Sequence, residues 1–363
     1  MVRSPIRIAI VTAAGLMAAL GMVAAAPAAG AHPGGGHKGF TVVADHLNNP
    51  RGLSPAKDGG LYLAEAGAGG GTCVSGGPEG QTCLGLTGSL DKVSAGGVVR
   101  RIVTGLISGS GPGGVAAEGP VSVSRGPDST FFAQFGHLWL VKRHGRATNV
   151  SDVGDQDWTW TSTRINLAPK DYPDANPNTV LYSGGHLYVA DAGANILVQV
   201  KRNGAAKVLA FFPVPAGSQS DAVPTCVARG PDGALYVGEL LGGFYTPGHA
   251  RIWRVVPGHA PKVWATGLTT VQGCGFGSDG AFYATEFQTS GLNESPQGNP
   301  AGDVVRIDRH GHRTHLGVGK LFYPSGFAAG PHGSVYVSNC SIAPATGLGP
   351  QLCSTGGQVV RIG

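Results

Sequence analysis

One short unit recurs six times along the chain, and this repeat limits the folds that the chain can adopt. Each copy has a turn, then a run of apolar and aromatic residues that ends in a polar residue. The aromatic anchors of the six copies are Tyr62, Phe131, Tyr188, Tyr236, Tyr283 and Tyr336. Subtracting these numbers in order gives intervals of 69, 57, 48, 47 and 53 residues. A period near 40–50 residues that is rich in strands and turns is typical of β-propeller blades, so we expect an all-β, six-bladed β-propeller.

Each unit divides into four strands, most clearly in the fourth copy. Its strands are expected at residues 225–228, 234–238, 251–255 and 262–266. The turn Pro231-Asp232-Gly233 separates the first two, because proline presets φ and glycine accepts a positive φ. We therefore expect four-stranded blades whose first strands line a central channel.

The two ends of the repeat region complete each other. The sixth unit stops after its third strand, at residues 358–362, and lacks a fourth. Residues 40–45 form an isolated strand pattern similar to the fourth strands of the other units. We expect these segments to pair and close the ring, because closure protects the sheet edges that an open blade would expose. The propeller then covers residues 40–363.

The first 31 residues have the features of a secretory signal peptide. Arg3 and Arg7 precede an apolar run at residues 8–26, and Ala29-Gly30-Ala31 supplies a small-residue cleavage site. A membrane anchor is the alternative, but the run is short for a membrane span. Residues 32–39 are expected to form a flexible Gly/His tail. We expect a secreted, extracellular bacterial protein with no transmembrane segment after cleavage.

The composition argues against nucleic acid binding. The formal net charge is +5 and charged residues make up 13% of the chain. No basic stripe is present in the sequence. The 62 glycines and 25 prolines suit a fold with many turns. The partners that we expect are a small molecule, a glycan or a protein.

The six cysteines form three pairs along the chain. They are Cys73, Cys83, Cys226, Cys274, Cys340 and Cys353. The first and last pairs each fall in the loop after a second strand, and in an exported protein such pairs are expected to form local disulfide bonds. The middle pair occupies matching places on the first strands of the fourth and fifth units. Its members form either a third disulfide bond between neighbouring inner strands or two separate buried thiols.

A polar residue stands at the end of the second strand in every unit. The six are Glu65, Gln134, Asp191, Glu239, Glu286 and Asn339. In an up-down meander these ends open on the same face as the starts of the first strands, at the mouth of the channel. The side chains either cap backbone amides or converge on a cation or polar ligand. Oxygen ligands suit calcium or magnesium, and gathered carboxylates raise one another's pKa.

Further polar residues stand where the first strands start. They are Asn49, Glu118, Asn176, Asp221, Gln272 and Tyr323. Long insertions fall on the same face, at residues 67–88, 151–175, 288–302 and 340–353. Loops of this length in a compact domain are usually functional or disordered. The second insertion contains Asp157-Trp158-Thr159-Trp160, a segment suited either to stack on a ring or sugar or to pack as a lid.

These repeats resemble a known group of proteins. The second-strand pattern Gly-x-Leu-Tyr-Val-Ala-Asp at residues 185–191 and the third-strand pattern Val-Val-Arg-Ile at residues 359–362 are similar to NHL-type six-bladed propellers. Over nearly all of residues 40–363 the chain resembles the exported bacterial propellers of the ScyD/ScyE family. More distantly it resembles the SMP-30/gluconolactonase and virginiamycin B lyase-like enzymes.

The distant resemblance implies a metal site. In SMP-30-like propellers, acid and amide residues hold a metal where the inner strands start, and Glu118 and Asn176 resemble such positions. With Asp191 and Glu239 they form the set that we expect for Ca²⁺ or another divalent cation. Lyase-like members use a histidine near the metal, and neither set of polar positions contains one.

Two functions follow from these patterns. The first is a binding module that uses the loop-decorated face over the channel, and for it the sequence assigns no certain cofactor. The alternative is a divalent-metal-dependent hydrolase or isomerase for a lactone or ester, with the metal as Lewis acid and a carboxylate as base. An enzyme needs the carboxylates to converge within reach of one metal ion, whereas a scaffold lets them cap backbone. His310, His312 and His315, on the outer part of the fifth unit, are expected to be solvated.

Overall fold

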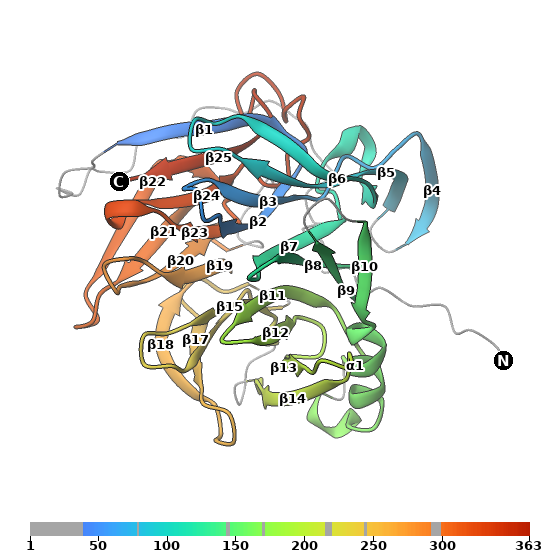
Figure 1. Ribbon diagram of the computed structural model, residues 1–363, viewed down its shortest axis with the longest axis vertical. Helices are drawn as coiled ribbons and strands as arrows, with labels where there is room; N and C mark the ends of the chain where they lie inside the picture. Colours follow the sequence, from blue (N-terminus) through green and yellow to red (C-terminus); the bar gives the residue numbers. More distant parts are fainter. Residues whose placement is uncertain are drawn as a thin grey trace.

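The computed structural model describes residues 39–77, 80–142, 146–168, 171–214, 220–242, 245–291 and 299–363. The predicted signal peptide and nearly all of the predicted tail lie outside the described residues. The chain forms a β-propeller of six antiparallel blades arranged in a ring, which confirms the predicted fold (Figure 1). In the described part of the chain, no helix is both long and apolar enough to cross a membrane.

Each blade has four strands that follow one another from the centre outward. Blade 1 contains β2 (Pro50–Pro55), β3 (Leu61–Glu65), β5 (Gly80–Val93) and β6 (Val99–Ser110); blade 2 contains β7 (Pro120–Arg125), β8 (Ser129–Gln134), β9 (His137–Lys142) and β10 (Ala147–Ser151); blade 3 contains β11 (Pro177–Ser183), β12 (His186–Asp191), β13 (Ile196–Val200) and β14 (Ala206–Phe211). Blade 4 contains β15 (Pro224–Arg229), β16 (Leu235–Glu239), β17 (Ala250–Val255) and β18 (Lys262–Leu268); blade 5 contains β19 (Val271–Phe276), β20 (Phe282–Glu286), β21 (Ala301–Ile307) and β22 (Arg313–Phe322); blade 6 contains β23 (Phe327–Ala329), β24 (Val335–Asn339), β25 (Gly357–Ile362) and β1 (Phe40–Leu47).

The inner strands form a closed circle. β2 contacts β7, β7 contacts β11, and the contacts continue through β15, β19 and β23 back to β2. The outermost strand of blade 6 comes from the start of the propeller, since β1 pairs antiparallel with β25 and places Phe40 opposite Ile362. The predicted ring closure is therefore confirmed, and β25 has no open edge.

The core lies between neighbouring blades. Successive side chains of a strand point to opposite faces of the sheet, so each blade presents one apolar face to the blade before it and one to the blade after it. Between blades 4 and 5, Ile252, Phe282 and Val305 are almost completely buried in one cluster. Similar clusters of Val, Leu and aromatic residues join the other blades.

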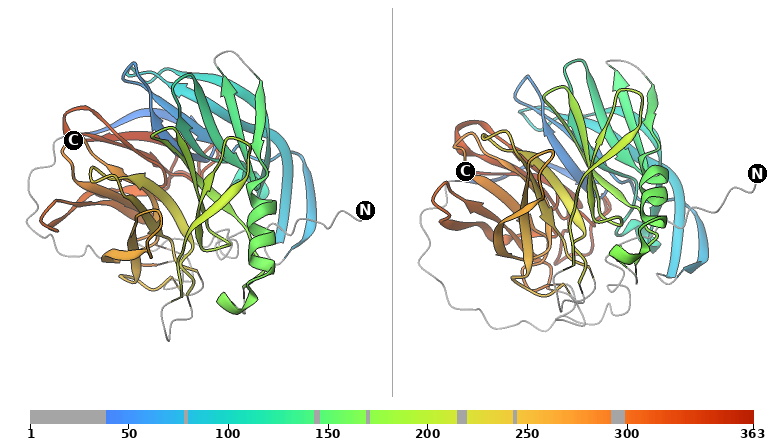
Figure 2. Two further views of the ribbon diagram at one scale, coloured as in Figure 1. Left: turned by 60° about the horizontal axis from the view of Figure 1, so that its bottom comes forward. Right: turned by 90° about the horizontal axis from the view of Figure 1, so that it is seen from below.

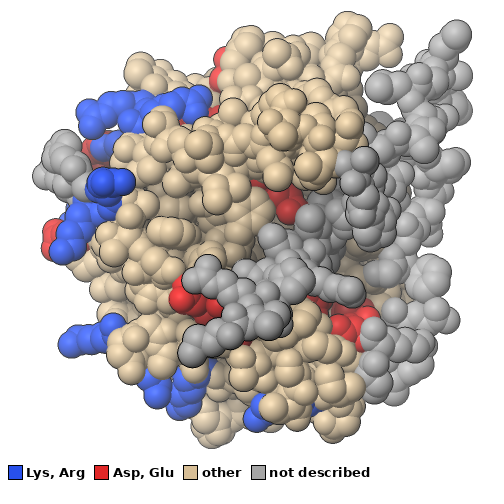
Figure 3. Space-filling view, turned by 90° about the vertical axis from the view of Figure 1, so that its right-hand side faces the viewer, with Lys and Arg blue, Asp and Glu red and all other residues tan. Residues whose placement is uncertain are grey.

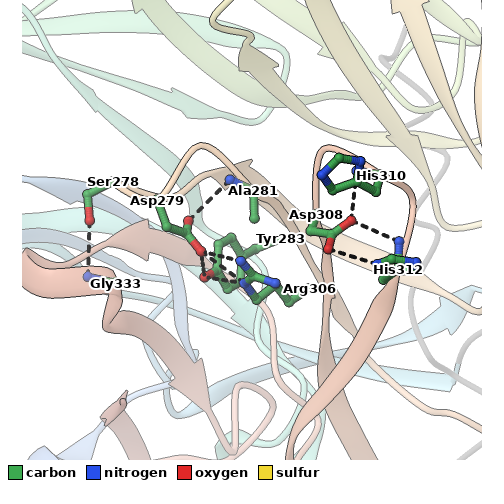
Figure 4. Close-up of polar contacts among 9 residues, drawn as sticks. All are labelled: Ser278, Asp279, Ala281, Tyr283, Arg306, Asp308, His310, His312 and Gly333. Carbon is green, nitrogen blue, oxygen red and sulfur yellow. Dashed lines mark hydrogen bonds and ion pairs between the residues drawn. The ribbon is translucent and has the colours of Figure 1, made fainter.

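A polar contact explains part of the repeated sequence. In blade 5 the hydroxyl of Tyr283 donates to Asp279 at 3.0 Å, and Arg306 donates to the same carboxylate oxygen at 2.7 Å (Figure 4). Blade 4 repeats the contact, with Tyr236 donating to Asp232 at 3.1 Å. The aspartate lies in the turn, the tyrosine in the second strand and the arginine in the third. One ion pair thus ties three elements of the blade together.

Two of the expected long loops are regular structure instead. Residues 67–88 include β4 (Thr72–Gly77), which pairs with β5 and extends blade 1 as a hairpin. The insertion at residues 151–175 contains α1 (Val153–Ser162) and the short 3-10 helix η3 (Ile165–Leu167). Figure 2 shows α1 and the hairpin at the same edge of the molecule. The other 3-10 helices of the described residues are η2 (Pro112–Gly114) and η4 (Pro331–Gly333).

The physical reasons differ for the two insertions. The hairpin forms because residues on both sides of its turn pair strand to strand, with Cys73 directly opposite Cys83. α1 begins after Asp152 and carries Asp155 in its first turn, where a negative charge favours the positive end of the helix dipole. Its sequence is rich in Trp, Thr and Asp, which have weak helix propensity, so composition did not predict a helix there.

Candidate functional site

A central cavity of about 620 Å³ lies inside the ring and is lined by residues of all six inner strands. Neighbouring inner strands can approach one another closely because glycine, which has no side chain, stands at the points of contact. A Cβ atom on Gly52 would lie 2.7 Å from Cα of Ser122, and one on Gly326 would lie 2.2 Å from the carbonyl oxygen of Arg51. A cavity of this volume is in the range that proteins use for small molecules.

Polar side chains gather where the inner strands start. Arg51, Glu118, Asn176 and Gln272 all line the cavity, and each comes from a different blade or the segment leading into it. The guanidinium of Arg51 donates a 2.8 Å hydrogen bond to the carbonyl oxygen of Ala117. Burial lowers the pKa of Arg51 to about 10, an effect that the negative charge of Glu118 opposes. Arg51 therefore remains a cation at neutral pH.

The tryptophans of the α1 segment point in different directions. Trp158 lines the cavity together with Asp155. Trp160 packs against the protein instead, with its ring centroid 6.5 Å from that of Tyr172 and 4.5 Å from the guanidinium carbon of Arg164. One aromatic side chain of this segment is thus presented to the cavity, and the other fixes α1 on blade 3.

His137 also lines the cavity, although the sequence analysis did not single it out. Its Nδ1 lies 2.8 Å from a carboxylate oxygen of Asp152. A two-residue turn between β8 and β9 brings His137 to this position. Both residues of the turn, Phe135 and Gly136, have positive φ. Such a tight hairpin places the first residue of β9 next to the strand end that was predicted to lie at the mouth.

The six polar residues at the ends of the second strands are not among the residues that line the cavity in the described structure. All six are buried. Glu65 accepts from the backbone N–H of Asn48, Asp191 from Asn176 at 2.7 Å, Glu286 from Thr269 at 2.6 Å and Asn339 from Phe322 at 2.7 Å, while Gln134 donates to the carbonyl of Ile107 at 2.7 Å. Each of these side chains therefore caps a backbone group near the junction of two blades, either in the connecting segment or at the end of an outer strand.

Glu239 differs from the other five because it forms an ion pair. Two nitrogens of the Arg251 guanidinium donate to its two carboxylate oxygens, both at 2.8 Å. The backbone N–H of Arg251 and the indole N–H of Trp253 donate to the same carboxylate. Burial raises the pKa of Glu239, and the Arg251 contacts oppose this shift. Both carboxylate oxygens of Glu239 therefore already have hydrogen-bond donors from blade 4.

Several other buried carboxyl groups come in pairs that hold protons. Burial, reinforced by neighbouring Asp91, raises the pKa of Glu65 to about 9. Burial and Asp303 raise the pKa of Glu286 to about 8. Burial and Asp191 raise the pKa of Asp157 in α1. In each pair, burial and the neighbouring carboxyl group disfavour the charged form.

The residues expected to hold a divalent cation fall into two groups. Glu118 and Asn176 line the cavity, whereas Asp191 and Glu239 are turned into the blades. Within the described residues, one group of three side chains has the spacing of metal ligands. It consists of Glu286, Asp303 and His315. None of these three lines the cavity.

The three outer histidines of blade 5 behave differently. His310 and His312 are exposed, and His312 donates its backbone N–H to Asp308 at 2.9 Å (Figure 4). His315 is exposed, as expected, but it also contacts a buried carboxylate. Its Nδ1 lies 2.6 Å from a carboxylate oxygen of Asp303, because β22 places His315 opposite Val305, two residues from Asp303 on β21.

All six cysteines form disulfide bonds, as Cys73–Cys83, Cys226–Cys274 and Cys340–Cys353. The open question about the middle pair is therefore settled in favour of a bond. It joins β15 to β19, and both of its cysteines line the cavity. The wall between blades 4 and 5 is thus covalently fixed.

The surface beside α1 has few charged groups among its described residues. Figure 3 shows Lys and Arg along the left and lower margins of that face, while most of the other described surface is uncharged. Carboxylates appear there in small separate groups.

No protein-family model matches the chain, and no curated protein matches it. Among solved structures, a gluconolactonase from Xanthomonas campestris is 11% identical, with 89% of each chain covered and a TM-score of 0.54. The PQQ-bound aldose sugar dehydrogenase from Streptomyces coelicolor is 12% identical over 90% of this chain and 98% of that one, with a TM-score of 0.53. Regucalcin, a calcium-binding protein from Agrobacterium tumefaciens, is 14% identical over 90% and 94%, with a TM-score of 0.51.

The structural neighbours include SMP-30/gluconolactonase-like six-bladed propellers. The distant resemblance to that class is thereby supported at the level of the fold. Identities this low show the fold alone, and the same fold carries unrelated activities in different proteins.

Proposed function

We propose that this protein is an exported binding module of the ScyD/ScyE type, which takes a small, oxygen-rich ring compound such as a sugar or sugar acid into its central cavity. The observation that carries the proposal is that Arg51, Glu118 and Trp158 all line one cavity of about 620 Å³. The wall of this cavity thus offers a cation, a carboxylate and an indole to a ligand.

Each of these groups suits a part of such a ligand. The planar guanidinium of Arg51 donates hydrogen bonds to carboxylate or hydroxyl oxygens. Glu118 accepts from hydroxyl groups, and the amides of Asn176 and Gln272 both donate and accept. The indole of Trp158 offers a flat apolar surface to the carbon face of a ring. A multiply hydroxylated ring uses all four types of contact.

Export is a further part of the proposal. Three disulfide bonds are typical of proteins that fold in an oxidising compartment. The signal-peptide pattern of residues 1–31 agrees with that environment.

Binding is tested by ligand-observed NMR on the mature protein. Glucose, gluconate, glucuronate and galacturonate are mixed with the wild type, Trp158→Ala and Arg51→Met. We expect saturation transfer to at least one sugar or sugar acid in the wild type and its loss in both variants. Equal transfer in all three proteins, or none in the wild type, would contradict the proposal.

A second candidate function is the metal-dependent lactone or ester hydrolase or isomerase. It is favoured by the presence of Glu118 and Asn176 in one cavity with His137, whose ring is held by Asp152. If a divalent cation were bound there, Glu118 and Asn176 would be its ligands in this chain, and the cation would polarise a carbonyl oxygen. His137 is placed to accept a proton at the same site.

The two candidates separate in one assay. Hydrolysis of gluconolactone is followed at neutral pH by acid release, with and without EDTA, for the wild type, Glu118→Gln and His137→Gln. Turnover that is lost with EDTA and in both variants identifies the enzyme. Binding in the NMR experiment without turnover identifies the binding module.

A further inference from the structure

Glu286, Asp303 and His315 come together from three strands of blade 5, away from the central cavity. Glu286 ends β20, Asp303 is the third residue of β21 and His315 is the third residue of β22. One ligand-type atom of each lies within 4.8 Å of those of the other two. The sheet therefore fixes an imidazole and two carboxyl groups at one point.

An unpartnered buried oxygen sets this cluster apart from an ordinary surface group. Asp303 is 4% exposed, and its Oδ1 has no hydrogen-bond partner among the described residues. Its other oxygen meets Nδ1 of His315 at 2.6 Å. Glu286 uses one oxygen to accept from the N–H of Thr269. A buried carboxylate oxygen without a partner is costly, so this position favours either a proton shared with Glu286 or a cation that takes the place of that proton.

Blades 1 and 4 place an arginine beside the equivalent acidic residue. In blade 4, Arg251 pairs with Glu239 at 2.8 Å. In blade 1, a guanidinium nitrogen of Arg101 lies 3.5 Å from Glu65. Within the described part of blade 5 and its neighbours, neither Glu286 nor Asp303 forms an ion pair with Lys or Arg. Blade 5 offers a histidine at this place instead.

Arg313, the arginine of β22, points away from Glu286 and Asp303 and bonds to backbone carbonyl groups of β18. Arg313 donates from Nη1 to the carbonyl oxygen of Gly267 at 3.0 Å and from Nη2 to that of Thr266. It therefore ties β22 to the end of β18 and does not occupy the carboxylate pair. The exposed side of His315, with 53% of its side chain accessible, leaves a path from solvent to the cluster.

We propose that Glu286, Asp303 and His315 form a binding site for a divalent transition-metal cation of the zinc type. One imidazole nitrogen and two carboxylate oxygens are a ligand set that zinc accepts, with water in the remaining position. Calcium is a poorer match, because it takes six to eight oxygen ligands. This site is separate from the cavity of the proposed function and does not depend on it.

The test is a zinc titration of the mature protein against a chromophoric chelator of known affinity. Wild type, His315→Ala and Asp303→Asn are compared, and their folding is checked by circular dichroism. We expect one zinc ion bound per wild-type chain and a loss of affinity of at least about tenfold in each variant. Co²⁺ in place of Zn²⁺ should give visible absorption bands in the wild type that His315→Ala removes.

The matched control is His312→Ala, which removes a more exposed histidine of the same blade. It should bind zinc as the wild type does, and any weak binding by the N-terminal histidines is common to all the variants. His315→Ala keeps the test decisive if Asp303→Asn fails to fold, because His315 lies at the surface. The proposal is overturned if wild type and His315→Ala bind zinc equally, if His312→Ala loses as much affinity, or if the wild type binds none.

Discussion

Two sets of polar residues stand on the same side of the propeller and meet different surroundings. At the starts of the inner strands, Glu118, Asn176 and Gln272 line the open cavity. At the ends of the second strands, residues such as Asp191 and Glu239 are completely buried and bonded within the protein. Both sets consist of acids and amides, so residue type does not separate a binding position from a structural one.

The difference comes from the backbone around each strand end. The segments that join two blades contain N–H groups without a partner in a strand ladder, such as those of Asn176 and Thr269. A buried N–H needs an acceptor, and the side chain at the end of the second strand supplies it. At the inner-strand starts the surroundings vary: Glu118, Asn176 and Gln272 line the channel, whereas Asn49 is buried and bonded to backbone groups, as the strand ends are.

The largest effect on stability that this comparison predicts is that of Glu239→Ala, which tests the structural role of the strand ends. It leaves the guanidinium of Arg251 and the indole N–H of Trp253 without their buried acceptor. We expect a loss of about 3 to 5 kcal/mol in the free energy of unfolding, measured by chemical denaturation. Asp58→Ala, which removes the exposed ion pair with Lys92, is the control and should lose about 1 kcal/mol or less. Equal losses in the two variants would contradict a structural role for Glu239.

The cavity wall should also depend on its covalent link. Replacing both Cys226 and Cys274 by alanine opens a loop with a sequence separation of 48, for which chain entropy gives a loss of about 4 kcal/mol. Replacing Cys73 and Cys83, with a separation of 10, should lose about 3 kcal/mol. The same denaturation experiment compares them. A larger loss from the hairpin pair would show that the channel wall does not need its disulfide bond.

The buried carboxyl pairs should make stability depend on pH. The pKa of Glu65 is raised from 4.5 to about 9, so the folded chain holds a proton that the unfolded chain has released across this window. Stability should therefore fall as pH rises from about 5 to 9, by up to about 1.4 kcal/mol per unit for a single group. Glu65→Gln, which stays neutral, should flatten part of this slope. Denaturation at pH 5, 7 and 9 measures it, and an unchanged slope in the variant would contradict the assignment.

A smaller effect on stability is expected at the cavity. Arg51→Met loses one charged hydrogen bond to the carbonyl oxygen of Ala117, so the free energy of unfolding should fall by about 1.5 to 3 kcal/mol, less than for Glu239→Ala. The same variant should abolish sugar-acid binding in the NMR experiment. A loss as large as that of Glu239→Ala would place Arg51 among the structural residues and remove the contrast between the two sets.

The sequence was informative about the blades because their physics is local. Alternating strands, the Pro-Asp-Gly turn and the matched ends predicted six blades, their order and the closure by β1. The local pairs Cys73–Cys83 and Cys340–Cys353 followed from their positions in the repeat, whereas the sequence left Cys226 and Cys274 open between a bond and two separate thiols. These features depend on neighbours along the chain or on a fixed register between adjacent strands.

The candidate site was harder to predict because it depends on the direction of single side chains. The six polar residues at the ends of the second strands were assigned to the correct strands. The direction of their side chains, however, depends on backbone amides that the repeat pattern does not describe. Trp158 faces the cavity only because its segment is a helix, and weak helix formers hid that helix. His137 reaches the cavity through a tight turn that was not considered.

The most direct test of the central claim is a crystal structure of the protein soaked with the sugar or sugar acid that gives the strongest NMR signal. We expect density for the ligand inside the central cavity, with an oxygen within hydrogen-bonding distance of Arg51 and the ring against Trp158. Density at the outer rim with an empty cavity, despite binding in solution, would contradict the account.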